Sequence, residues 1–183
     1  MKMLTRYQTN SIMDTAMEDL KGYENFLRKL AENDSSTIIS NGGKDHAVIL
    51  YSVLFDNTDK EVRIFCQSGN SEVWQDPVFI EALDKFLEKP GTDLKVLTAG
   101  EPSLASRWTD KENVDAFHIQ EADKELIYTH FRNRKCNFAV FDKKRYRYEF
   151  NCDEFKAYGS FNAPEDSNEM AEMFDAAFVN ASR

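Results

Sequence analysis

The sequence lacks the features of several protein classes. Its three cysteines, Cys66, Cys136 and Cys152, are odd in number and lack the spacing of a metal site, so neither a disulfide framework nor a zinc site is predicted. No apolar run reaches the roughly 18 residues of a membrane-spanning helix. The first residues show no secretory signal pattern. We therefore expect a cytoplasmic protein with no metal ion and no other cofactor.

The common nucleotide-binding and hydrolase motifs are absent as well. The chain contains no G-x-G-x-x-G after a strand, no P-loop, no G-x-S-x-G and no H-E-x-x-H. It has only three histidines, His46, His118 and His130, and a single histidine is more often structural than catalytic. Dinucleotide enzymes, P-loop enzymes, serine hydrolases and zinc proteases are therefore excluded.

Positive charge is also scarce. The net charge is −9, from 23 Lys and Arg against 32 Asp and Glu, and we do not expect bulk nucleic-acid binding from such a balance. Basic residues gather only between Arg132 and Arg147. This stretch is either a solvated basic hairpin or a local anion-binding patch.

What is present is the composition of a packed globule, with 42% hydrophobic and 13% aromatic residues. Apolar spacing predicts a helix over 10–33 and a short strand over 37–40. Helices from about residue 45 and from Pro77, which follows the capping residue Asp76, then alternate with strands over 62–66 and 94–98. Such units predict neighbouring parallel strands, with Ile64, Phe65, Val96, Leu97, Ala139 and Val140 in the core.

The rest of the chain favours hairpins. Strands are predicted over 114–119, 137–141, 145–151 and 157–161, a short helix over 121–130 and a last helix over 164–180. The fold class is therefore α/β, with a mixed, mainly parallel sheet flanked by helices. We assign residues 1–44 to an N-terminal helix and short strand and residues 45–183 to one α/β globule. The extra first helix packs across the sheet or mediates a homodimer.

One segment carries a degenerate motif. Lys135 to Asp142 is followed by Gly159-Ser160-Phe161-Asn162 and then by Asn168-Glu169. This order resembles the second part of a phospholipase D-like half-domain, whose signature is H-x-K-x4-D, then G-S-x-N, then an N-x-E or N-E pair. The resemblance covers roughly residues 45–178 and implies a phospholipase D-like fold for the 45–183 globule.

The sequence departs from that signature at the positions that matter most. Lys135 stands at the His position and Asn137 at the Lys position, and the gap from Asp142 to Gly159 requires an inserted hairpin over 143–158. In working members, two motifs meet in one site and a His attacks phosphorus. The resemblance therefore implies a protein that cannot run this chemistry in this register.

The surviving residues suggest an anion site. Lys135, Asn137, Ser160 and Asn162 would converge on a phosphate, with Arg132 or Arg134 at the rim. Alternatively, Ser160 and Asn162 only satisfy backbone groups where a strand turns into a helix. The alternation of basic and aromatic residues over 145–150 is also open to two interpretations. It is either a stacking surface for single-stranded nucleic acid or, as we favour, a strand with its aromatics inward and its arginines outward.

The function predicted from these observations is a catalytically inactive binding or regulatory accessory protein. Its partner would be a protein or a phosphate-containing ligand. The alternative is a metal-independent phosphodiesterase or nuclease with a rearranged site around His130. His130-Phe131-Arg132 imitates H-x-K, although position 137, where an Asp would be required, is Asn.

Overall fold

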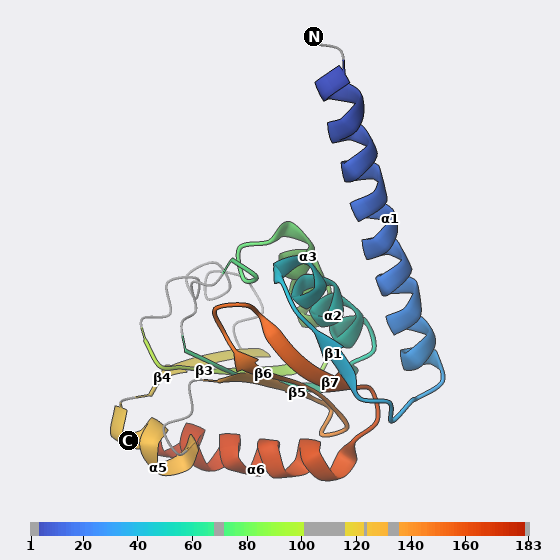
Figure 1. Cartoon of the computed structure of the whole chain (residues 1–183). Helices are drawn as coiled ribbons and strands as arrows, with labels where there is room; N and C mark the ends of the chain where they lie inside the picture. The colour runs from blue at the N-terminus through green and yellow to red at the C-terminus, as the bar shows by residue number, and fades with distance from the viewer. Residues whose placement is uncertain (1–3, 68–71, 101–115, 123, 132–135, 182–183) are drawn as a thin grey trace.

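The computed structural model describes residues 4–67, 72–100, 116–122, 124–131 and 136–181 (Figure 1). The helices are α1 (Leu4–Glu32), α2 (Lys44–Asp56), α3 (Pro77–Leu87), α5 (Lys124–Phe131) and α6 (Pro164–Ala181). The strands are β1 (Ile39–Asn41), β2 (Glu61–Cys66), β3 (Asp93–Thr98), β4 (Phe117–Glu121), β5 (Asn137–Phe141), β6 (Arg145–Asn151) and β7 (Lys156–Ser160).

The strands form one sheet in the order β1-β7-β6-β5-β2-β3-β4. The predicted parallel pairing of β2 with β3 is confirmed, with Ile64 opposite Val96. β4 extends it in parallel, but the other four pairings are antiparallel, so the expectation of a mainly parallel sheet is wrong. The physical reason lies in the connections. β5, β6 and β7 are joined by tight turns, which cannot make the long crossover that a parallel pair requires.

β1 is the edge strand of this same sheet. Ile39 lies opposite Gly159 and Asn41 opposite Ala157, both in β7. The strand that we assigned to the N-terminal segment 1–44 therefore completes the sheet formed by the rest of the chain.

Helices cover both faces of the sheet, α2 and α3 on one side and α5 and α6 on the other (Figure 1). The six predicted core residues are all at most 1% exposed. They divide between two apolar cores because neighbouring residues of a strand point to opposite faces. Ile64, Val96 and Ala139 pack beneath α2 and α3, whereas Phe65, Leu97 and Val140 pack toward α5 and α6.

α1 packs against α2 through its C-terminal part, where Leu27 is fully buried and Ala31 nearly so. The N-terminal part of this helix projects beyond the rest of the molecule (Figure 1). In the described residues, no helix combines the length and the apolar character needed to cross a bilayer.

Candidate functional site

The degenerate motif begins where the structure gives no description. Lys135, Arg132 and Arg134 lie outside the described residues, so their expected place around an anion remains a prediction. Asn137 is the first residue of β5, and Asp142 follows the last residue of that strand.

Asp142 has a structural role. Its carboxylate accepts hydrogen bonds from the backbone N–H groups of Asp59, Lys60 and Glu61, at 2.8, 3.0 and 3.0 Å. Its backbone is left-handed, with φ of 51°, a conformation that Asp and Asn tolerate better than most residues. Asp142 therefore links the turn after β5, through these hydrogen bonds, to the segment that leads into β2.

Ser160 and Asn162 also bond to backbone groups. The Ser160 Oγ accepts from the Asn162 N–H at 3.3 Å, and the Asn162 side-chain amide donates to the Asp34 carbonyl at 3.1 Å. Ser160 is 1% exposed. These contacts agree with the second interpretation given above, in which Ser160 and Asn162 satisfy backbone groups where β7 leads into α6.

The sheet register separates Asn137 from Ser160. Asn137 lies opposite Glu149, and Ser160 lies opposite Tyr146, with β6 between the two strands. Glu149 and Tyr146 are an odd number of residues apart, so Asn137 and Ser160 point to opposite faces of the sheet. The expected convergence of Asn137 with Ser160 and Asn162 is therefore not found, because the inserted hairpin supplies a strand that divides them.

Asn137 instead belongs to a buried cluster with Arg147, Glu149 and Tyr51, which we call the Arg147 cluster. The Asn137 amide donates to the Glu149 carboxylate at 2.5 Å and accepts from the Gln67 N–H at 2.8 Å. Arg147 pairs with Glu149 at 2.7 Å, and its guanidinium lies 5.0 Å from the centre of the Tyr51 ring. Both amide atoms of Asn137 are thus bonded within the protein.

The Arg147 cluster leaves almost no free space. The Arg147 and Glu149 side chains are 1% and 4% exposed. The cavity beside them measures about 10 Å³, the room of one water molecule at most. Burial raises the pKa of Tyr51 from 10.0 and that of Cys66 from 9.0 to about 12, as expected of groups enclosed in an apolar setting. A phosphoryl group does not fit there.

Sequence reasoning placed Arg147 on the wrong side of its strand. The favoured interpretation had arginines outward and aromatics inward, but Arg147 is buried and Phe150 is 42% exposed. The signal was Glu149, which follows Arg147 by two residues and therefore lies on the same face of the strand. An opposite charge at this spacing supplies the partner that a buried arginine needs.

The basic hairpin is largely neutralised by its own neighbours. Lys144 pairs with Asp34 at 2.5 Å and Arg145 lies 3.6 Å from Asp142, in addition to the pair of Arg147 with Glu149. Lys143 at the turn is exposed. The described part of the hairpin is thus a set of ion pairs more than a free anion-binding patch.

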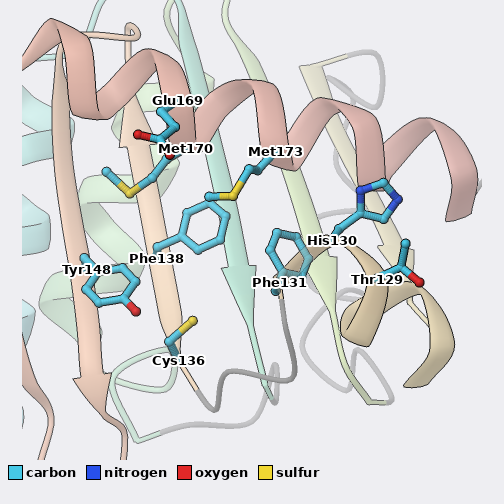
Figure 2. A pocket seen from close by; sticks show the side chains of 9 residues that line it. All are labelled: Thr129, His130, Phe131, Cys136, Phe138, Tyr148, Glu169, Met170 and Met173. Atoms are coloured by element: carbon cyan, nitrogen blue, oxygen red, sulfur yellow. The ribbon is translucent and has the colours of Figure 1, made fainter.

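An open cavity lies on the other face, between α5, α6 and the sheet (Figure 2). Its volume is about 360 Å³. It is lined by side chains from both helices and from the start of β5 and the middle of β6, namely Thr129, His130, Phe131, Cys136, Phe138, Tyr148, Glu169, Met170 and Met173.

His130 borders this cavity, and its Nε2 lies 3.3 Å from the Asn180 side-chain nitrogen. The other two histidines are elsewhere. His118 faces Asp93 at 3.7 Å, and the His46 ring packs edge-on against Tyr23, with ring centres 4.6 Å apart. No second histidine lines the cavity, and no group of three or more metal-ligating side chains occurs within the described ranges.

Comparison with known proteins gives the fold. No family model matches the sequence, and no curated protein matches it either. The structure is similar to TrmBL2, an archaeal chromatin protein with a described mode of DNA binding, at a TM-score of 0.52 and 13% identity over 98% of this chain and 67% of that one. It is also similar to NucT from Helicobacter pylori, at a TM-score of 0.51 and 7% identity over 79% of this chain and 98% of that one. At these identities the two likenesses show a shared fold.

The likeness to TrmBL2 corrects one expectation. We did not expect bulk nucleic-acid binding, on the ground of a net charge of −9. The fold of this chain, including nearly its whole length, occurs in a chromatin protein that binds DNA. Net charge alone is therefore not a valid ground for excluding nucleic acid, because binding depends on local charge and contacts and not on the sum over the chain.

Proposed function

We propose that this chain is a catalytically inactive, nucleic-acid-binding accessory protein with a phospholipase D-like fold. The observation that supports inactivity is the state of Asn137, which stands at the Lys position of the motif. Its amide is bonded to Glu149 and to the Gln67 backbone, in a cluster whose remaining space is about 10 Å³. A phosphoryl group would have to displace a buried ion pair, which is strongly unfavourable.

The nucleic-acid part of the proposal is supported by the two similar structures, a DNA-binding chromatin protein and a nuclease. We assign the phosphate contacts to Arg132, Arg134 and Lys135, the basic residues of this region whose structure is not described. The logarithm of the DNA-binding constant falls linearly with the logarithm of the salt concentration. Removal of one cationic side chain that contacts a phosphate makes this slope less steep by about 0.9.

Two measurements on the purified protein test this function. We expect the protein to retard the migration of labelled single- or double-stranded DNA in a gel-shift assay. We also expect no hydrolysis of bis(p-nitrophenyl) phosphate in the presence of EDTA. Replacement of Arg132, Arg134 and Lys135 by Ala should reduce the steepness of log K plotted against log salt concentration by about 3. Lys143→Ala, at an exposed lysine, should leave this slope nearly unchanged. Absence of DNA binding at low salt contradicts the proposal.

A metal-independent phosphodiesterase centred on His130 is the second candidate. The open cavity beside this histidine favours it, as does the likeness to NucT. Hydrolysis in EDTA that is abolished in His130→Ala and kept in His118→Ala would replace the first proposal with this one.

We further propose that α1 forms a homodimer. Met13, Ala16 and Leu20 follow one another at the three- and four-residue spacing of a coiled-coil seam, in the part of the sequence that precedes the contact of Leu27 with the core. A helix that projects from its domain is only marginally stable alone in water. Light scattering after gel filtration should give a dimer for the whole chain and a monomer after deletion of residues 1–17. A monomeric whole chain contradicts this assignment.

A further inference from the structure

The cavity beneath α6 has walls suited to a flat ring. Phe131 and Phe138, which are 4% and 1% exposed, form its buried floor, toward which Met173 reaches from α6 (Figure 2). The accessible walls are the half-buried Tyr148 and Met170 and the 36% exposed Met173. Aromatic faces and polarisable thioethers favour planar partners. At about 360 Å³ the cavity is near the lower end for small-ligand sites, so it has room for one base or nucleoside.

Glu169 is the acidic residue of this cavity, and it lies exposed at the Met170 end of the rim, away from His130 (Figure 2). Across the described part of the chain, no hydrogen bond or ion pair engages its carboxylate. A carboxylate is acceptor-only and can take two parallel N–H groups at once. Of the common bases, guanine offers two neighbouring N–H donors on one edge, from N1 and from the 2-amino group, and adenine does not.

The surface next to the cavity continues its aromatic character. Tyr148, which lines the cavity, lies opposite Tyr158 across the β6–β7 pair. The Tyr158 ring stacks on Phe150 with centres 4.8 Å apart, and these two residues are 45% and 42% exposed. Exposed rings in line with a base-sized cavity are typical of surfaces on which successive unpaired bases stack.

We propose that this cavity binds a guanine base, with Glu169 at the rim accepting its N1–H and 2-amino hydrogens and with the ring held beside Tyr148 and the methionines of α6. The base would come either from a free nucleoside or from an unpaired position of a nucleic-acid strand. The second source rests on the proposed nucleic-acid function, and the first does not.

A titration of guanosine, inosine and adenosine, followed by NMR of the methionine methyl groups, tests the hydrogen-bond pattern. Inosine lacks the 2-amino group and adenosine lacks both donors, so we expect affinity to fall in that order, with at least a tenfold gap between guanosine and adenosine. Glu169→Gln should abolish the preference, whereas Glu172→Gln, at a likewise exposed glutamate of α6 that does not line the cavity, should retain it. Met170→Trp should fill the cavity and block all three. Equal binding of guanosine and adenosine, no saturable binding, or binding that survives Met170→Trp would overturn the assignment.

A second titration separates the two sources. An oligothymidylate with one central dG, compared with the same strand without it, should bind more tightly to the wild type if the base enters from a strand, and Phe150→Ala should weaken that binding without affecting guanosine. A preference for guanosine with no difference between the strands assigns the cavity to the free nucleoside. If both oligonucleotides bind equally and guanosine does not bind, the cavity assignment falls while the nucleic-acid function stands.

Discussion

On the α2/α3 face of the sheet, Arg147 and Glu149 are buried and bonded to one another, whereas on the α5/α6 face Glu169 and His130 border an open cavity. Each face thus carries one carboxylate and one basic residue. In the first case the charges neutralise each other and hold strands together. In the second, our proposal assigns the Glu169 carboxylate to a ligand. The comparison teaches that the polar groups on the two faces of one sheet can differ in role: one set is closed by its own partners, and in our proposal the other serves a ligand.

The sharpest test of this contrast is to remove one acid from each face. Glu149→Ala leaves Arg147 buried without its partner, and we expect a loss of about 3–5 kcal/mol in the free energy of unfolding. Glu169→Ala, on the open face, should change it by less than about 0.5 kcal/mol. Urea denaturation measures both. The double variant Arg147→Met/Glu149→Leu should recover most of the loss, and a loss below about 1 kcal/mol for Glu149→Ala contradicts the closed cluster.

Alkaline pH should weaken the closed face. Burial raises the pKa of Cys66 from 9.0 to about 12 and that of Tyr51 from 10.0 to about 12, so the neutral forms are favoured in the folded state. Their stabilisation is full below pH 9 and falls as the pH rises toward 12, by roughly 1.4 kcal/mol per pH unit for each group while only the unfolded chain ionises. Unfolding measured from pH 8 to 11 should show this decline, and Cys66→Ala should flatten its lower part. The same slope in the variant would contradict the assignment to Cys66.

Two neighbours on α6 test how open the other face is. Phe174 is fully buried, and Phe174→Ala should cost about 3–5 kcal/mol. Met173 is 36% exposed at the cavity, and Met173→Ala should cost less than about 1 kcal/mol because its side chain has little packing to lose. Thermal unfolding of the two variants gives the comparison. Similar losses would mean that the cavity closes in solution.

The smallest effect is expected at the hairpin tip. Lys144 pairs with Asp34, but both side chains are more than a third exposed, and such a pair contributes at most about 1 kcal/mol. Lys144→Ala should therefore shift the unfolding midpoint only slightly, and less at high salt than at low salt. Lys143→Ala serves as the matched control, and a larger effect there would show that the tip has a role beyond surface pairing.

Apolar periodicity predicted most elements of the fold from the sequence, including the parallel contact of β2 with β3 and the six core residues, but not their division between two cores. It did not predict the face on which Arg147 lies. Alternation along β6 establishes that Arg147 and Tyr148 point to opposite sides, but helices cover both sides of this sheet, so hydropathy alone cannot decide which side carries the ion pair. The spacing from Asp142 to Gly159 indicated an inserted hairpin. It could not show that the hairpin lies between β5 and β7, because strand order depends on pairing between distant segments.

The pairing of β1 with β7 has a consequence for the order of folding. Ile39 meets Gly159, so the strand nearest the N-terminus bonds to the strand nearest the C-terminus. Contacts between such distant segments form slowly, because the intervening chain must first be closed into a loop. During synthesis from the N-terminus, β1 waits without a partner until β7 has been made. The β1 edge of the sheet is therefore completed last, although β1 is synthesised before the other strands.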